Sequence, residues 1–288
     1  MADLAASIRA RLLDRAREIG EDHNLTLNRF ATERFLFRLG RTPWREKFLL
    51  KGALLFDLWF DHAHRPTRDA DFLGFGPEDS GWLRNAVSEI CAADANDGLK
   101  FDAATIIVEE IRDDARYGGF RVRFVSYMGK SRCTVQIDIG FGDAVTPAPT
   151  DIEYPSVLHG FPSAQLRAYA RETVFSEKLE AIVNLGMANS RMKDFYDLRA
   201  LIREGALDAS LLGQAIAATF TRRGTQMPTE VPVGLSEEFA HDAIKLTQWK
   251  AFLGKNRLQA IALEDVISEL REFAMMALKS ASANSVKP

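Results

Sequence analysis

The stretch TRDADFLG, residues 67–74, decides the predicted fold, because its two aspartates alternate with one small and one aromatic residue. Such alternation indicates a β-strand with one wet face and one buried face. Asp69 and Asp71 therefore leave the same face of the predicted strand, with their side chains starting about 7 Å apart. Gly74 and Gly76 end the strand.

Three further strands are predicted after this stretch, at residues 101–111, 120–127 and 132–141. Turn signals separate these strands at Gly118-Gly119 and at Gly129-Lys130. Segments with helical spacing lie on both sides of them. The sequence therefore predicts an α+β fold, in which an antiparallel or mixed sheet has flanking helices.

The predicted helices are those segments in which apolar residues recur at helical spacing. They span residues 4–19, 28–39, 83–91, 176–189, 193–203, 211–220, 236–252 and 263–278, and residues 48–58 combine a short strand with a helix start. Four of the ten prolines cluster between residues 146 and 162 and predict an extended crossing. We therefore predict a sheet domain with N-terminal helices at residues 1–150 and a helical C-terminal half at residues 151–288.

Composition excludes several classes of protein. The hydrophobic fraction of 47% and the charged fraction of 27% are those of an ordinary globular protein. No apolar run is long enough for a transmembrane helix or a signal peptide, so we expect a cytoplasmic protein without a membrane partner. The two cysteines, Cys91 and Cys133, lie in unrelated contexts and form no zinc or redox motif. The formal net charge of −3 excludes a uniformly basic surface, so any contact with RNA must be local.

Asp69 and Asp71 are candidate metal ligands. Like charges this close repel each other, so the pair is costly unless Mg²⁺ (or Mn²⁺) or an arginine compensates. A third carboxylate, Asp138, lies between two isoleucines on the predicted strand 132–141, and Asp143 is its nearest competitor. Three carboxylates on adjacent strands are what metal-dependent phosphoryl transfer requires. The alternative is a surface strand with solvated acids.

The segment Lys51-Gly52-Ala53 joins a predicted strand to a helix start ahead of the aspartates. Glycine at such a turn permits the close approach of backbone amides to a phosphate, and a helix N-terminus favours an anion. Lys51 would add positive charge there. The alternative is a plain turn with this lysine in solvent.

Basic residues near the predicted site are candidates for phosphate contacts. Arg65 and Arg68 border the aspartate pair, and they either clamp a phosphate or pair with the aspartates. The best local basic patch for an RNA backbone consists of Arg121, Arg123, Lys130 and Arg132. Exposed strands are also often basic for solubility alone.

These motifs, taken in order, resemble a known family. The combination consists of Lys51-Gly52-Ala53, Arg65, Thr67, Asp69-Ala70-Asp71, Asp138, Glu177-Lys178-Leu179-Glu180-Ala181 and Lys193-Asp194-Phe195-Tyr196-Asp197-Leu198. It is similar to the AbiEii/AbiGii nucleotidyltransferase toxin family, which includes the MenT toxins, over about residues 35–202. The resemblance implies a nucleotidyltransferase-like sheet, phosphate contacts by the small residues after the first strand, and metal binding by the aspartate pair. The family usually has a second glycine or a serine in place of Ala53, so this chain lacks a hydroxyl contact there but keeps the backbone contact.

The same resemblance gives the helical half a lysine and an aspartate that complete the nucleotide site. Lys178 would neutralise the triphosphate of the nucleotide. Asp194 is our preferred catalytic acid, while Asp197 joins Lys178 among the residues expected to bind the nucleotide. The alternative interpretation makes Asp194 a helix N-cap and Asp197 an acid of the first helical turn.

The sequence thus predicts a nucleotidyltransferase that moves a nucleoside monophosphate from an NTP to an acceptor hydroxyl. Asp69 and Asp71 would hold Mg²⁺, and Asp138 would also ligate metal and polarise the attacking hydroxyl. By resemblance, the acceptor is RNA, at the 3′ end of a tRNA, and the chain is a toxin with a cognate antitoxin protein. Two alternatives remain, namely an enzyme of the same fold that modifies a small molecule or a protein, and a non-catalytic nucleotide-binding module.

Overall fold

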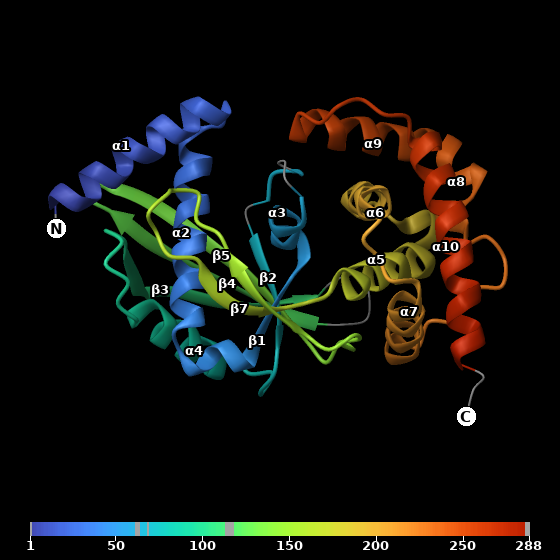
Figure 1. Ribbon diagram of the computed structural model, residues 1–288, viewed down its shortest axis with the longest axis horizontal. Coiled ribbons are helices and arrows are strands. Elements are labelled where there is room, and N and C mark those ends of the chain that lie inside the picture. The colour runs from blue at the N-terminus through green and yellow to red at the C-terminus, as the bar shows by residue number, and fades with distance from the viewer. Residues whose placement is uncertain (1, 61–63, 68, 113–117, 286–288) are drawn as a thin grey trace. The chain divides into compact units, whose positions relative to one another are not determined.

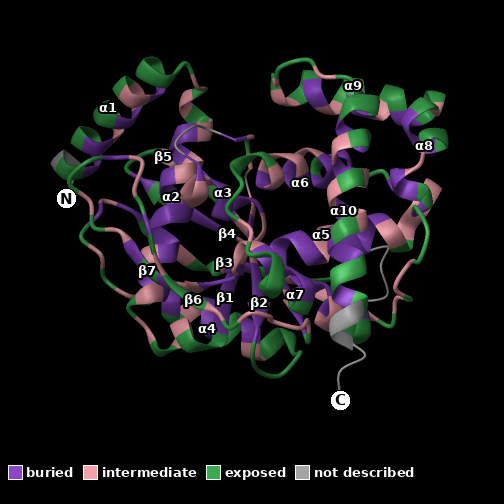
Figure 2. Cartoon of the chain, turned by 45° about the vertical axis from the view of Figure 1, so that its right-hand side comes forward, coloured by how far each residue is buried: buried purple, intermediate pink, exposed green. Residues whose placement is uncertain are grey.

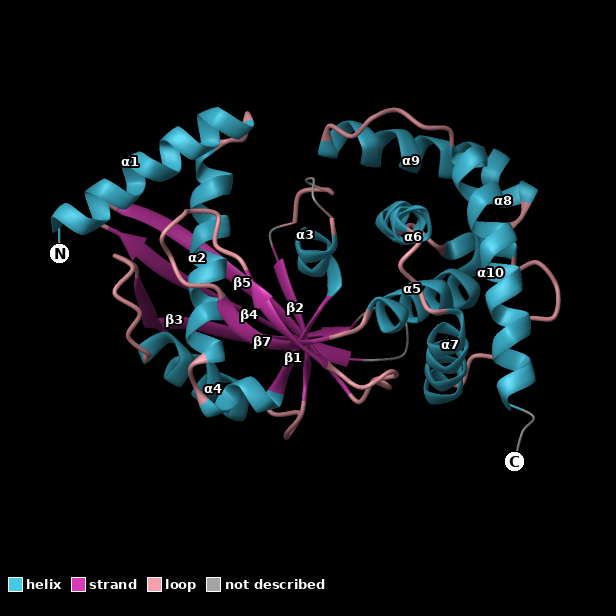
Figure 3. Cartoon of the chain, viewed as in Figure 1, coloured by secondary structure: helices cyan, strands magenta, loops and turns pink. Residues whose placement is uncertain are grey.

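The structure is a computed structural model that describes residues 2–60, 64–67, 69–112 and 118–285. The chain forms two compact units, because most contacts between residues lie within one unit or the other. The first unit comprises Met1–Gly142 and Thr150–Ala168, and the second comprises Asp143–Pro149 and Tyr169–Pro288. In the described part of the chain, every strand belongs to the first unit and the second unit is helical (Figure 3).

The first unit is built on a seven-stranded sheet with the order β3-β4-β5-β2-β1-β7-β6 (Figure 1). The strands are β1 (Phe48–Lys51), β2 (Asp69–Gly74), β3 (Lys100–Arg112), β4 (Gly118–Met128), β5 (Ser131–Phe141), β6 (Thr150–Tyr154) and β7 (Ala164–Ala168). Strand β2 is parallel to β5, and β1 is parallel to β7. The remaining neighbours are antiparallel. The predicted mixed sheet with flanking helices is therefore confirmed.

One face of this sheet is apolar and the other is polar. On β5, Val135, Ile137 and Ile139 are buried. Gln136 and Asp138, which alternate with them, are only half-buried. The helices α2 (His23–Gly40) and α4 (Ser80–Ala92) pack on the sheet, and α1 (Ala2–Ile19) packs on α2. Two short 3₁₀ helices, η1 (Pro43–Lys47) and η2 (Gly52–Leu55), and a four-residue α-helix, α3 (Phe56–Trp59), complete the unit.

The sheet contains two strands that the sequence did not predict. Strand β6 lies within the proline-rich segment that we expected to be an extended crossing, and β7 follows directly after that segment and forms a parallel pair with β1. The unit boundary therefore differs from the predicted division at residues 150/151, because residues Thr150–Ala168 are held in the sheet by these backbone hydrogen bonds. Pro155 directly follows β6, and Pro162 lies before β7, so both prolines stay outside the two five-residue strands.

The second unit consists of helices and short helical turns. They are α5 (Arg171–Leu185), η3 (Gly186–Ala188), α6 (Met192–Glu204), α7 (Ala209–Arg223), η4 (Val233–Leu235), α8 (Glu237–His241), α9 (Ala243–Asn256) and α10 (Leu263–Ser285). The predicted helix at residues 236–252 is two helices, because the side chain of Asp242 accepts hydrogen bonds from Ile244 N and Lys245 N and so starts α9. No helix in the described ranges is both long and apolar enough to cross a bilayer.

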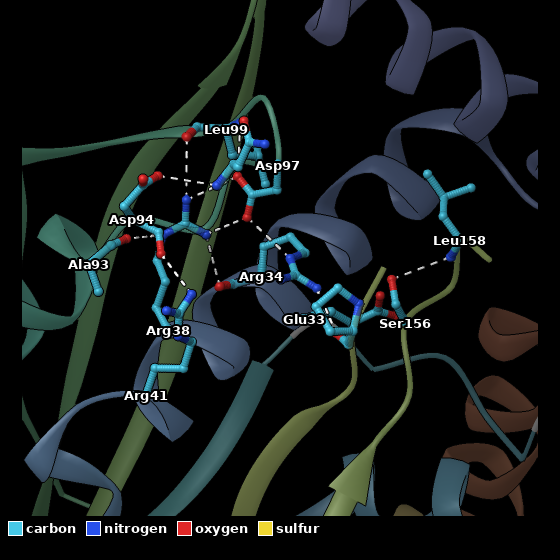
Figure 4. A network of polar contacts seen from close by, with 12 residues as sticks. Glu33, Arg34, Arg38, Arg41, Ala93, Asp94, Asp97, Leu99, Ser156 and Leu158 are labelled. Atoms are coloured by element: carbon cyan, nitrogen blue, oxygen red, sulfur yellow. Dashed lines mark hydrogen bonds and ion pairs between the residues drawn. The ribbon is translucent and has the colours of Figure 1, made fainter. Parts of the chain in front are cut away.

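A buried ion cluster anchors α2 in the first unit (Figure 4). Asp97, which is fully buried, accepts hydrogen bonds from Arg34 Nε at 3.1 Å and from Arg38 Nη2 at 3.0 Å. Arg34 Nη1 also donates to Pro162 O at 3.0 Å. The cluster therefore joins α2 to the segment after α4 and to the segment before β7. Much of α2 is buried, and Figure 2 draws the buried residues in purple.

We expect Asp97→Ala to destabilise the protein by roughly 3–5 kcal/mol, because it leaves two buried guanidinium groups without their carboxylate. Urea unfolding measures the change. The control is Asp14→Asn, which removes an ion pair with Arg17 between side chains that are 76% and 70% exposed. This control should change the stability by less than about 1 kcal/mol. Equal effects of the two substitutions would show that the cluster does not anchor α2.

Glu33 is a second buried acid on α2 and is 4% exposed. Its Oε2 accepts a hydrogen bond from Val157 N at 2.7 Å, and its Oε1 lies 3.5 Å from Arg29 Nε. Burial raises the pKa of Glu33 from 4.5 to about 7, since these partners offset only part of the lost hydration. The carboxyl group therefore keeps its proton in the folded protein at pH values where the unfolded chain has lost it.

This raised pKa predicts a pH-dependent loss of stability. As pH rises from 4.5 to about 7, the unfolded chain binds fewer protons at Glu33 than the folded chain does, so the free energy of unfolding falls. Relative to Glu33→Gln, the wild type should lose roughly 1 kcal/mol per pH unit over this interval. Urea unfolding at pH 5, 6, 7 and 8 measures the difference, with Glu18→Gln on α1 as an exposed control. A difference between wild type and Glu33→Gln that does not change with pH would contradict the assignment.

Candidate active site

Charged side chains from four neighbouring strands lie in one row across the sheet. Lys51 of β1 lies opposite Asp71 of β2. Asp71 lies opposite Asp138 of β5, which in turn lies opposite Arg121 of β4. Residues in register across a sheet point to the same face. The row therefore brings together a predicted phosphate contact and two of the predicted metal ligands.

Asp69 lies on the same face of β2 as Asp71, opposite Gln136 of β5. Ala70 between the two aspartates is fully buried, whereas both aspartates are half-buried. The prediction that residues 69–73 form a strand with one wet face is confirmed. It places the two carboxylates side by side on the polar face of the sheet.

Gly52 allows the backbone after β1 to approach the carboxylate of Asp71. A Cβ atom added at Gly52 would lie 2.1 Å from Asp71 Oδ2 and 2.8 Å from its carboxyl carbon. Gly52 also has a φ of +74°, in the left-handed region that glycine favours. A larger residue at position 52 would therefore displace the Asp71 carboxylate in addition to straining the backbone.

Asp138 is held by Arg121 through both of its oxygens. Arg121 Nε donates to Oδ1 at 2.9 Å and Nη2 donates to Oδ2 at 2.7 Å. The hydrogen bonds to Asp138 raise the pKa of Arg121, and the charges of Asp69 and Asp71 add to this effect. Arg121 therefore compensates part of the negative charge of this row. The sequence predicted that the aspartates need such compensation, either from an arginine or from a divalent cation.

Asp143, the competitor of Asp138, has a different position. It lies beyond the end of β5 and accepts hydrogen bonds from Arg223 Nε at 3.2 Å and Nη2 at 3.0 Å. Both residues belong to the second unit. Asp138 is therefore the carboxylate in register with Asp71.

The turn between β1 and β2 differs in one respect from the prediction. β1 ends at Lys51 and Gly52 starts a turn, as expected, and Ala53 is buried. The helix that follows is only a four-residue 3₁₀ turn continued by a four-residue α-helix. A macrodipole of useful size requires a longer helix, so any phosphate contact here would come from individual backbone amides.

The other residues predicted to bind nucleotide lie just before β2. Thr67 Oγ1 donates to Asp69 O at 3.4 Å, so this hydroxyl supports the start of the strand. Arg65 is half-buried. Arg68 lies outside the described residues.

In the second unit, Lys178 of α5 is held by both candidate acids of α6. Its Nζ lies 2.6 Å from Asp194 Oδ1 and 2.9 Å from Asp197 Oδ2. Both aspartates are fully buried, and Lys178 is 11% exposed. Arg191 Nε adds a hydrogen bond to Asp194 Oδ2 at 2.7 Å. The structure thus brings the predicted lysine and both predicted aspartates into one cluster.

The alternative that Asp194 caps the helix is wrong. Helix α6 begins at Met192 with Arg191 as N-cap residue, and no side chain caps it. Asp194 is the third helical residue, and its carboxylate binds Lys178 and Arg191 instead. Although burial favours the protonated acid, Lys178 and Arg191 together hold the pKa of Asp194 below its usual value. Asp194 therefore stays ionised against Lys178.

Among the three candidate carboxylates of the first unit, Asp69 and Asp71 fit a hard divalent cation best. Asp69 and Asp71 offer oxygen donors on one face, which suits Mg²⁺ or Mn²⁺. Across residues 2–60, 64–67, 69–112 and 118–285, however, no three acidic, histidine or cysteine side chains converge as a ready metal site. Both oxygens of Asp138 are bonded to Arg121. Metal ligation by Asp69 and Asp71 fits the donor set, and ligation by Asp138 stays a prediction.

Sequence reasoning placed Arg121 in a basic patch and missed its pairing with Asp138. Gly129-Lys130 forms a two-residue turn, with Met128 opposite Ser131. Counting outward from such a turn pairs residues at equal distances from it, which puts position 121 opposite position 138. This signal was available in the sequence. Arg191 gave no comparable signal, since its contact depends on how α5 and α6 pack.

The basic patch is weaker than predicted. Arg121 pairs with Asp138, and Arg123 Nη2 donates to Glu109 Oε2 of β3 at 2.5 Å. Arg132 is exposed, as is Lys130 in the hairpin turn. Acids therefore offset two of the four charges.

Comparison with known proteins finds a matching family model and solved structures that share the fold. The family model described as "Nucleotidyl transferase AbiEii toxin, Type IV TA system" matches residues 34–269. No curated protein matches the chain significantly. The crystal structure of JHP933 from Helicobacter pylori superposes with a TM-score of 0.50 at 18% identity, covering 90% of this chain and 94% of that one. MenT4, the nucleotidyltransferase toxin Rv2826c from Mycobacterium tuberculosis H37Rv, has a TM-score of 0.51 at 18% identity, covering 96% and 98%. At this identity the structural matches show a shared fold.

The contact between Gly52 and Asp71 predicts a specific effect of Gly52→Ala. The substitution should cost roughly 1–3 kcal/mol in backbone strain and should also weaken Mn²⁺ binding, because the new Cβ displaces the Asp71 carboxylate. Gly20→Ala is the matched control, since Gly20 has a φ of +68° but no atom within 4 Å of its added Cβ. Thermal unfolding measures the strain, and Mn²⁺ titration followed by electron paramagnetic resonance measures the binding. Equal Mn²⁺ affinity in the two variants would contradict the prediction.

Proposed function

This chain belongs to the AbiEii family of nucleotidyltransferase toxins of type IV toxin–antitoxin systems, and we propose that it transfers a nucleoside monophosphate from an NTP to the 3′-terminal hydroxyl of an RNA. Nucleotidyl transfer is the activity of the family, whose model matches residues 34–269. The observation that carries the assignment of the site is the row of Lys51, Asp71 and Asp138 beside Gly52 on the polar face of the sheet. Such a row suits a reaction in which charge develops on phosphate oxygens.

Asp69 and Asp71 are the proposed metal ligands. A divalent cation bound there would polarise the phosphate and lower the pKa of the attacking hydroxyl. The shared face of the two aspartates and their oxygen donors support this role. The close approach of Gly52 would keep the Asp71 carboxylate in one position.

Asp138 is proposed to orient the acceptor hydroxyl. A carboxylate has about four lone-pair positions, and the pair with Arg121 uses two of them. The remaining positions can accept a hydrogen bond from a hydroxyl group. Because Arg121 fixes both oxygens, Asp138 would hold that hydroxyl in a defined direction.

The phosphate contacts are proposed to come from two sets of residues. The backbone of Gly52 and Ala53 would donate to the triphosphate, with charge added by Lys51 and Arg65, while Thr67 would support the start of β2. Lys178 would neutralise the triphosphate, and Asp194 and Asp197 would fix its ammonium group. The 2.6 Å and 2.9 Å contacts of Lys178 support this division of roles, which makes both aspartates positioning residues.

An RNA acceptor, with the 3′ end of a tRNA as the candidate, follows from the family resemblance rather than from a large basic surface. Lys130 and Arg132 on the β4–β5 hairpin are the best candidates for contacts with its backbone. NTPs and RNA would meet the protein in the cytoplasm. Membership in a toxin–antitoxin family also implies a cognate antitoxin as a protein partner.

The assay that tests the proposal uses purified protein with Mg²⁺ and each of the four α-labelled NTPs. Label that enters total RNA supports the proposed acceptor. Label that enters only proteins or small molecules of a cell extract would support the alternative enzyme instead. Calorimetry that detects no Mg²⁺-dependent NTP binding would support the non-catalytic module, which family membership disfavours.

Asp71→Asn should lower transfer at least about 100-fold, because it keeps the shape of the side chain but removes the charge that holds the cation. Label incorporation measures the loss of transfer. The free energy of unfolding should stay within about 1 kcal/mol of the wild-type value. Asp151→Asn is the control, since Asp151 is an aspartate of the same sheet whose side chain is 76% exposed. Full incorporation by Asp71→Asn would overturn the metal assignment.

A further inference from the structure

A charged residue lies on the buried face of α9, where an apolar residue is expected. Lys245, Trp249 and Leu253 are the buried residues of this helix, and they recur at every fourth position. The exposed fraction of Lys245 is 5%. Burial of an ammonium group costs free energy unless hydrogen-bond acceptors compensate it. The partners of Lys245 therefore indicate what this lysine does.

Lys245 holds the backbone that leads into α6. Its Nζ donates to Asn189 O at 2.9 Å and lies 5.4 Å from the centre of the Phe239 ring. Asn189 is fully buried and lies in the loop between η3 and α6. Its side-chain Oδ1 accepts a hydrogen bond from Arg191 N at 2.8 Å. The lysine is therefore bonded to one end of a short loop whose other end is Arg191.

The same loop leads to the cluster around Lys178. Arg191 Nε donates to Asp194 Oδ2 at 2.7 Å, and Lys178 Nζ donates to Asp194 Oδ1 at 2.6 Å. All of these residues belong to the second unit. A continuous series of hydrogen bonds within that unit therefore runs from Lys245 of α9 to Lys178 of α5.

Aromatic packing connects Lys245 with the first turn of α6 by a second route. Phe239 of α8, whose ring lies beside Lys245, stacks on Phe195 of α6 with the ring centroids 5.1 Å apart. Both rings are fully buried, and Phe195 directly follows Asp194 in the chain. Helix α6 packs against both α9 and α5 (Figure 1). The helix turn that carries Asp194 is thus supported from the side of α9.

We propose, on the basis of the proposed function, that Lys245 is a positioning residue for the contact of Lys178 with the triphosphate. The hydrogen bond from Lys245 fixes the backbone at Asn189. That backbone sets the position of Arg191, which orients the carboxylate of Asp194 and with it the ammonium group of Lys178. An apolar side chain of similar length would fill the same space but could not donate this hydrogen bond.

Lys245→Met tests the proposal, because methionine has a similar length and lacks the donor. Calorimetry with inorganic triphosphate in the presence of Mg²⁺ measures the binding of the group that all four NTPs share. Lys245→Met should weaken this binding roughly 10-fold. The control is Lys250→Met, which changes an exposed lysine of the same helix and should leave the affinity at the wild-type value. Thermal unfolding checks that each variant is folded.

A double-mutant cycle separates positioning from a general structural effect. In a Lys178→Met background, Lys245→Met should cause no further loss of affinity, because the group that Lys245 positions is gone. If Lys245→Met fails to fold, Asn189→Ala interrupts the same series of hydrogen bonds at its next member. It should give the same two results.

Wild-type affinity in folded Lys245→Met would overturn the inference. An equal loss with and without Lys178 would overturn it as well, since Lys245 would then act on the fold in general. Both results leave the proposed function intact, provided that Lys178→Met itself weakens binding. Unchanged binding in Lys178→Met, or no binding of triphosphate to wild type, would instead reject the proposed role of Lys178, and the inference with it.

Discussion

Strand β2 is hydrogen-bonded on both sides, antiparallel to β1 and parallel to β5, and the candidate site of the first unit depends on this pairing. The register puts Lys51, Asp71 and Asp138 in one row, and the pairing of β5 with β4 adds Arg121. A shift of one residue in β2 would turn both aspartates toward the apolar face. Burial of Ala70 and Phe72 makes such a shift costly, so packing on one face of the strand fixes the chemistry on the other.

The same balance between acids and cations recurs in the second unit. Asp194 and Asp197 are fully buried, and Lys178 and Arg191 compensate them. A buried ion group of this kind is a poor source of stability, because desolvation consumes most of the attraction between its members. The arrangement suits a role in positioning the side chain of Lys178 better than a role in stability. The ammonium group of Lys178, bound by two carboxylates, has a fixed location.

Several elements show where sequence patterns are informative and where they are not. The alternation of β2, β4 and β5 and the spacing of the long helices were sufficient to predict the sheet and the helical half, because one face of each element meets water. β6 and β7 escaped prediction because strands of only five residues are defined by their hydrogen bonds to the sheet, and not by a periodic pattern. The break at Asp242 was hidden for a similar reason, since a single side-chain cap separates two helices with continuous apolar spacing.

The amino-acid sequence by itself determined which face of each strand the candidate site residues occupy, because side-chain periodicity is a local property of the backbone. It also contained the pairing of Arg121 with Asp138, through the two-residue turn between β4 and β5. Only the tertiary structure decided that Asp138 and not Asp143 lies beside Asp71, and that Lys178 binds both aspartates of α6. Those outcomes depend on strand order and helix packing, which are set by contacts between residues far apart in the chain.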